Sequence, residues 1–142
     1  MGNVRGTVRI GNQVHEFEVP GKWHEQTGDR PSFAPAFTYL FLQGDGTGLM
    51  ATRHARGAWG YLFSNGQTTP VTGMELEPYG RPVRKFVASL EDGRTVTGTA
   101  RIVREVSVPI EGARRPGAAV LAESDIGPLV GVLNDWQPDE RS

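Results

Sequence analysis

Apolar and polar residues alternate with a period of two along most of this chain. This is the pattern of β-strands with one buried face, because successive side chains point to opposite faces of a sheet. A hairpin is predicted over residues 4–19, where alternating segments flank a Gly11-Asn12 turn. Further strands are predicted at residues 37–43, 49–55, 59–64, 67–72, 74–78, 83–90, 95–108, 118–124 and 129–134.

Turn signals separate these strands. Asn65-Gly66 is a strong hairpin signal, and residues 111–117 are predicted as a loop because they contain glycine and proline. Residues 37–43 are almost entirely apolar, which predicts a strand buried on both faces. Gly98 lies inside the longest predicted strand and indicates a bend or a bulge there.

Helix is nearly absent from the prediction. The one candidate, residues 113–123, is interrupted by Pro116-Gly117. About ten short strands joined mostly by tight turns predict an all-β fold, either an antiparallel barrel or a sandwich. A barrel is favoured because closure removes exposed strand edges. We expect one barrel domain over residues 1–142, of about eight to ten strands, with a polar tail at 137–142.

The composition narrows the function classes. Hydrophobic residues make up 37% and charged residues 22%, which fits neither a disordered nor a membrane-spanning chain. The net charge of −1 gives no reason to expect a nucleic-acid partner. Cysteine is absent, which excludes disulfides and thiolate metal sites, and His15, His24 and His54 lack the spacing of metal ligands. No metal or cofactor is expected.

The N-terminus carries no apolar run, so neither a secretory signal nor a transmembrane helix is expected. The expected location is therefore the cytoplasm, with no membrane partner.

The densest polar cluster lies at residues 21–30. Here His24 and Glu25 are candidate proton-transfer groups, because an imidazole beside a carboxylate can move protons near neutral pH. Neighbouring side chains on a strand point to opposite faces, so these two share a pocket only if the strand has ended or bulges. In a regular strand His24 would instead share a face with Gln26. The alternative interpretation is a strand end with solvated charges.

Two aromatic rows form the second candidate. Each row occupies one face of its predicted strand, so the rows either line an apolar ligand cavity or simply fill the core. A weaker candidate is Arg53, which shares its face with Leu49 and Ala51, although an Arg53-His54 pair at a strand end is also typical of a solvated rim. The rows consist of Phe37, Tyr39 and Phe41, and of Trp59, Tyr61 and Phe63.

Several motifs in this order resemble one barrel domain of the carotenoid-hydratase-like branch of the lipocalin-like proteins. These motifs are Gly6 to Gly11, Pro20 to Gly28, Thr52 to His54, Trp59 to Phe63 and Ile126 to Leu133. The resemblance implies a lipocalin-like barrel that handles large apolar molecules, with His24, Glu25 and Gln26 in the family's polar motif. The chain departs from the family at Thr27, where a Trp is usual. Members also usually carry two such domains, so a homodimer is one way to supply the second half.

These observations together predict a cofactor-free enzyme that hydrates, dehydrates, isomerises or cyclises an apolar, terpenoid or polyketide-like substrate. His24 would be the general acid or base with Glu25 as its partner, and Gln26 would bind a substrate oxygen. The remaining substrate-binding candidates are Tyr39, Arg53, Trp59, Tyr61 and Phe63. Two alternatives stay open, namely a non-catalytic carrier of an apolar ligand and a structural domain with a filled core.

Overall fold

The computed structural model describes residues 2–21, 36–110 and 113–136. These residues form β-strands and turns without any helix, which confirms the all-β prediction. The strands are β1 (Gly2–Ile10), β2 (Gln13–Gly21), β3 (Phe37–Gln43), β4 (Thr47–His54), β5 (Gly57–Ser64), β6 (Gln67–Leu76), β7 (Val83–Leu90), β8 (Thr95–Ile110), β9 (Ala113–Ser124) and β10 (Gly127–Trp136).

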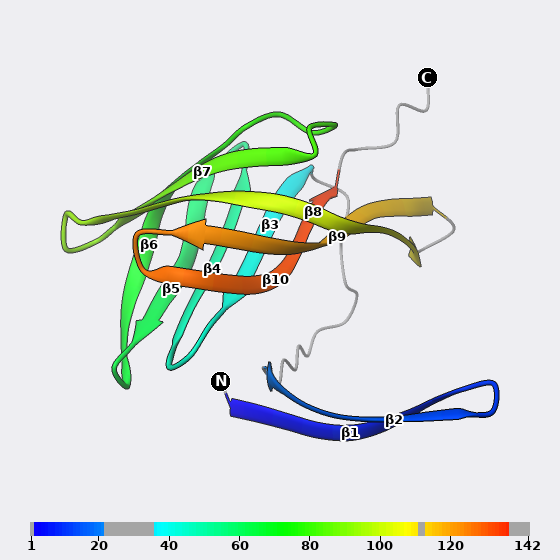
Figure 1. Ribbon diagram of the computed structural model, residues 1–142. Coiled ribbons are helices and arrows are strands. Elements are labelled where there is room, and N and C mark those ends of the chain that lie inside the picture. The colour runs from blue at the N-terminus through cyan, green and yellow to red at the C-terminus, as the bar shows by residue number, and fades with distance from the viewer. Residues whose placement is uncertain (1, 22–35, 111–112, 137–142) are drawn as a thin grey trace, which may run out of the picture. The chain divides into compact units, whose positions relative to one another are not determined.

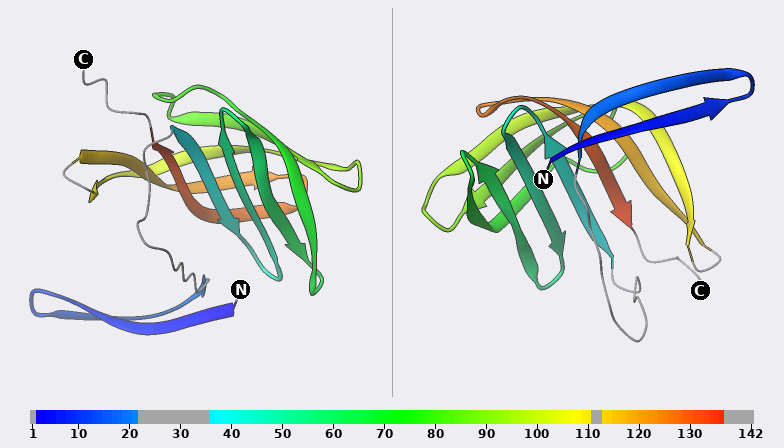
Figure 2. Two further views of the ribbon diagram at one scale, coloured as in Figure 1. Left: turned by 180° about the vertical axis from the view of Figure 1, so that it is seen from behind. Right: turned by 90° about the horizontal axis from the view of Figure 1, so that it is seen from below.

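Strands β3 to β10 form a closed eight-stranded antiparallel barrel (Figures 1 and 2). Each strand pairs with the next along the chain, and β10 pairs back with β3. Closure gives each barrel strand a hydrogen-bonded neighbour on both sides, so the barrel has no edge strand. The predicted antiparallel barrel is therefore confirmed, and its connectivity is the simple meander typical of lipocalin-like barrels.

Strands β1 and β2 form a separate two-stranded sheet, in a compact unit of their own, Met1–Pro31, while the barrel belongs to Ser32–Ser142. The hairpin is amphipathic. One face carries the Arg5–Glu18 ion pair, with 2.9 Å between Arg5 Nε and Glu18 Oε2. The opposite face carries the exposed apolar side chains Val4, Val8, Ile10, Phe17 and Val19.

The core of the barrel follows from the alternation. In β3, Leu40 and Leu42 have no exposed surface, and their partners across the β3–β4 ladder, Ala51 and Leu49, are equally buried. Burying one such leucine side chain stabilises the fold by roughly 1.5–3 kcal/mol. The odd-numbered aromatic residues of β3 are half-buried, because they lie on the outer face of the barrel. The prediction that residues 37–43 are buried on both faces is thus wrong for these positions.

Two strands contain a β-bulge. Residues 67–76 form one strand with a register shift between Val71 and Gly73, where two separate strands were predicted. In β8 the shift lies between Ile102 and Arg104 and not at Gly98, where it was expected. The ring of Phe86 covers Gly98 instead, and a Cβ there would lie only 2.5 Å from Phe86 Cζ. The predicted loop at 111–117 is also shorter, since β9 begins at Ala113.

Candidate functional site

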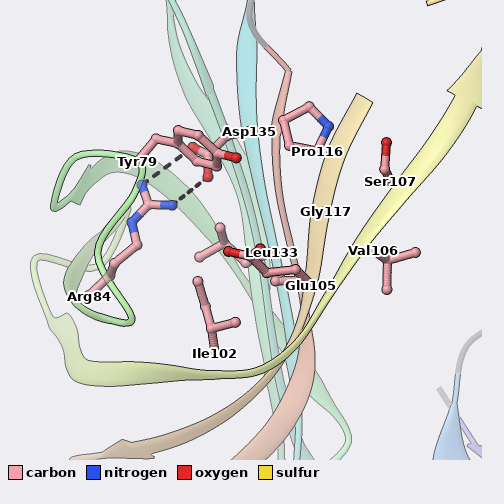
Figure 3. A pocket seen from close by; sticks show the side chains of 11 residues that line it. Tyr79, Arg84, Ile102, Glu105, Val106, Ser107, Pro116, Gly117, Leu133 and Asp135 are labelled. Carbon is pink, nitrogen blue, oxygen red and sulfur yellow. Dashed lines mark hydrogen bonds and ion pairs between the residues drawn. The ribbon is translucent and has the colours of Figure 1, made fainter. Parts of the chain in front are cut away.

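One end of the barrel holds a cavity of about 400 Å³ (Figure 3). It lies where β6 and β10 end and β7 begins. Ile102, Ala118 and Leu133 contribute apolar wall, while Arg84 and Asp135 contribute charged groups. Cavities of roughly 300–1,000 Å³ with mostly apolar walls and a few polar groups are typical of small-molecule sites.

A two-stranded ribbon forms one side of this cavity. The pairing of β7 with β8 ends at Arg101, and the pairing of β10 with β9 ends at Gly117. Beyond these residues Ile102 N–H still donates to the carbonyl oxygen of Pro82 at 2.8 Å. Farther out, β8 and β9 pair only with each other, to Ile110 and Ala113, and they extend past the end of the barrel (Figure 1). The ribbon thus adds a wall that a plain barrel would lack.

The bulge in β8 turns polar side chains toward the cavity. Up to Ile102 the even-numbered residues of β8 face the core, and Val96 and Ala100 are buried. After the bulge, Glu105 lies opposite Ala118, so odd-numbered residues now take the inner side. Glu105 and Ser107 accordingly line the cavity. Re-aiming a side chain next to a site is a known use of β-bulges.

A buried ion pair forms the polar floor of the cavity. The Arg84 and Asp135 side chains are only 2% and 3% exposed. Arg84 Nη1 donates to Asp135 Oδ2 and Arg84 Nη2 donates to Asp135 Oδ1 at 3.3 Å, in a two-pronged arrangement visible in Figure 3. Thr38 Oγ1 donates to the same Oδ1 at 3.0 Å. The two charges therefore compensate each other within the barrel.

The guanidinium of Arg84 retains hydrogen-bonding capacity. Its Nε donates to the carbonyl oxygen of Glu77 at 2.6 Å, which together with the two bonds to Asp135 accounts for three of its five N–H groups. The other two N–H groups have no partner among residues 36–110 and 113–136. Because Arg84 lines the cavity, these groups can serve a ligand.

The β6–β7 connection supplies Tyr79 to the cavity and is braced by Glu77. The carboxylate of Glu77 forms an ion pair with Arg81 at 2.9 Å and accepts the backbone N–H of Lys85 at 2.8 Å. The hydrogen bond from Lys85, more than the charge of Arg81, lowers the pKa of Glu77. Tyr79 is thus carried on a loop that is tied to the start of β7.

The predicted catalytic residues, His24 and Glu25, lie outside the described residues, as does Gln26. Their assignment stays a prediction.

The aromatic candidates lie on the outer face of the barrel, and this corrects the interior placement that we expected. Their positions alternate with the buried Leu40, Leu42 and Leu62, so the strand geometry directs them away from the core. Partial burial of Tyr39, and to a lesser degree the charge of the nearby Tyr61, raises the pKa of Tyr39 to about 12. The side chains concerned are Tyr39, Trp59, Tyr61 and Phe63, with Phe37 and Phe41 in the same rows.

Arg53 continues the inward-facing row of Leu49 and Ala51 and pairs with Thr38 across the ladder, at the same end of the barrel as the cavity. It is exposed, and it borders a shallower groove of about 260 Å³ together with Leu76 and Lys85.

His54 has a role in the turn between β4 and β5. Its Nδ1 accepts the backbone N–H of Arg56 at 2.8 Å, and its ring packs edge-on against Trp59 with ring centroids 4.2 Å apart.

Sequence reasoning missed Arg84, Asp135 and Glu105. The sequence does contain a signal for Arg84 and Asp135, because each is a charged residue at a position that alternation assigns to the buried face of its strand. Arg84 alternates in step with Phe86 and Ala88, and Asp135 does so with Leu133 and Leu129. Glu105 has no such signal, since its inward position depends on the bulge.

Comparisons with protein-family models, with curated proteins and with solved structures find no match for this chain. The barrel therefore rests on its own strand pairing. Within the ranges that the structure describes, no helix is long and apolar enough to cross a membrane. In those same ranges no three His, Asp or Glu side chains gather into a group that could hold a metal ion.

Proposed function

We propose that this protein binds a small, largely apolar molecule in the cavity at the open end of its barrel. The observation that carries the proposal is a cavity of about 400 Å³ whose wall is largely apolar and whose floor is the buried Arg84–Asp135 pair. The apolar wall would cover the body of the ligand, and the charged and polar side chains that line the cavity would orient its polar end.

The ion pair supports this proposal because it is a poor way to stabilise a core. Replacing a buried ion pair by apolar residues of similar volume is often neutral or stabilising. The opposite end of the barrel is filled with aliphatic side chains, so the fold itself does not require charge. An ion pair beside a cavity is better explained by a role in recognising a ligand than by a role in packing the core.

A cofactor-free enzyme acting on such a ligand is the second candidate. Glu105 favours it, because this carboxylate lines the cavity and takes part in no ion pair within the described part of the chain. The resemblance to the carotenoid-hydratase-like branch points to the same chemistry, with His24 and Glu25 as proton-transfer groups. Substituting these two residues by alanine distinguishes the candidates, since a carrier keeps its affinity and an enzyme loses turnover.

Binding is tested with the neutral apolar dye N-phenyl-1-naphthylamine, titrated against the whole protein with fluorescence as the readout. Ala118 is buried and lines the cavity, whereas its neighbour Ala119 faces away from it. We expect saturable binding that Ala118→Leu weakens at least about tenfold, because the added side chain occupies the cavity. Ala119→Leu on the same strand is the matched control and should bind normally. Unchanged binding by Ala118→Leu would contradict the proposal.

A further inference from the structure

The charges around the cavity indicate which polar group its ligand carries. Among the described residues that line it, Arg84 is positive, and Asp135 and Glu105 are negative, which leaves one net negative charge. Arg104 and Arg115 lie on the same ribbon, but strand alternation places both on its other face, and neither lines the cavity. Arg114 pairs with Pro109, farther out along the ribbon than Ser107 and Pro116. The described lining of the cavity therefore favours a cation over an anion.

Arg84 does not provide an anion site. Both of its Nη atoms already donate to the carboxylate of Asp135, so its charge is compensated by a partner in direct contact. A carboxylate ligand that approached the remaining N–H groups would come close to Asp135 and would share the cavity with Glu105. Repulsion from the buried carboxylate of Asp135 would oppose such a ligand most, because water screens the exposed Glu105.

Glu105 and Ser107 offer the groups that a cationic head needs. The bulge brings both onto the inner side of the ribbon, two residues apart on one face, and both have oxygen acceptors for an ammonium group. Tyr79 adds an aromatic ring to the same cavity, and aromatic rings also attract cations. The aliphatic wall at Ile102 and Leu133 remains for the apolar body.

We propose that the ligand is an amphipathic amine, with its ammonium group at Glu105 and its apolar part inside the open end of the barrel. This inference rests on the proposed function of the cavity and names the chemical class that it selects. Glu105 is exposed, so the expected selectivity for charge is moderate, about tenfold between an amine and the matching alcohol.

The test compares decylamine, 1-decanol and decanoate at neutral pH, each displacing N-phenyl-1-naphthylamine from the whole protein. Each of these ligands contains ten carbons in a straight chain, and they differ mainly in the charge of the head. The expected order of affinity is amine, then alcohol, then carboxylate. Glu105→Gln should remove the preference for the amine over the alcohol. Glu123→Gln, an exposed carboxylate on β9 that does not line the cavity, is the control and should change nothing.

The outcomes separate the two proposals. Equal binding of all three ligands, or a preference for the amine that survives in Glu105→Gln, would overturn the inference about charge while the cavity remains a binding site. Tightest binding of decanoate would overturn it in the same way. Failure of all three ligands and of the dye to bind would overturn the function of the cavity together with this inference.

Discussion

The two ends of the barrel are built on the same eight strands but are filled in different ways. At the closed end, where β3 ends and β4 begins, eight buried aliphatic side chains fill the interior, and none of them exceeds 4% exposure. At the open end, the same inward-facing rows continue into Thr38, Arg84 and Asp135 beside a cavity. The closed-end side chains are Leu42, Leu49, Leu62, Val71, Leu90, Val96, Ala122 and Leu129.

This difference shows that two features of a strand carry separate information. One is the alternation of inward-facing and outward-facing positions, and the other is the type of residue at those positions. The alternation decides which residues face inward along the whole length of β7, from Arg84 to Leu90. The residue types at each end decide whether the barrel is packed there or open. The closed end stabilises the fold by burying apolar surface, and the open end holds charged groups that contribute less to stability but can recognise a ligand.

The largest effect is expected from breaking the ion pair at the open end. Asp135→Ala leaves the buried Arg84 guanidinium without its counter-charge and should lower the free energy of unfolding by about 3–5 kcal/mol, measured by urea denaturation. The double variant Arg84→Met with Asp135→Leu should recover most of this loss, because it leaves no buried charge. Losses that simply add in the double variant would contradict the description of the pair as compensated.

A cavity-forming substitution at the closed end should affect stability alone. Leu49 has no exposed surface, so Leu49→Ala is expected to lower the free energy of unfolding by about 3 kcal/mol. Its affinity for N-phenyl-1-naphthylamine should stay within about twofold of the unmodified protein, since the substitution lies far along the barrel from the open end. A loss of dye binding as large as that of Ala118→Leu would argue that the two ends are not separate.

An apolar truncation at the open end should cost less. Ile102 is half-buried and already borders the cavity, so Ile102→Ala removes fewer contacts and should lower the free energy of unfolding by only about 1 kcal/mol. The enlarged cavity should change the affinity for the dye, which separates this variant from Leu49→Ala. The same two assays, urea denaturation and dye titration, provide the comparison.

The smallest effects concern acid titration at the two ends. Glu77 at the open end and Asp92 at the closed end both have a lowered pKa, the first mainly through the backbone N–H of Lys85 and the second mainly through the side chain of Arg94. A lowered pKa in the folded state adds stability above the ordinary pKa, and this is lost as the pH falls through the folded value. Glu77→Gln should therefore flatten the loss of stability below about pH 4.5.

Asp92→Asn should flatten the loss of stability in the same direction, below about pH 3.8. Only the change at Glu77 should also alter dye binding, because only Glu77 braces the loop that carries Tyr79. Urea denaturation over a series of acidic pH values gives the first readout and dye titration the second. An effect of Asp92→Asn on binding would contradict the separation of the two ends.

The sequence predicts the barrel well because turn chemistry and alternation are local. Asn65 and Gly66 have φ angles of 52° and 77°, the left-handed conformations that a tight hairpin turn requires and that these two residues tolerate. The sequence does not reveal which face of β3 is inside, because Tyr39 and Leu40 are both apolar and both faces of the strand therefore look suitable for a core. Only the closure of the barrel decides in favour of Leu40.

The candidate site was harder to predict because it depends on non-local pairing. Arg84 and Asp135 are 51 residues apart and meet only when β10 closes the barrel beside β3 and Thr38. Glu105 reaches the cavity only because the register of β8 shifts by one residue, and no glycine or proline marks that point in the sequence. Alternation alone would place Glu105 on the outer face.

The most direct test of the account is a titration of N-phenyl-1-naphthylamine followed by the methyl NMR signals of isoleucine, leucine and valine. Binding at the open end predicts saturable shifts of the Ile102 and Leu133 methyl groups, with the Leu49 and Leu62 methyl groups at the closed end unmoved. Shifts confined to the closed end, or the absence of any shift at Ile102 and Leu133, would contradict a binding site at the open end of the barrel.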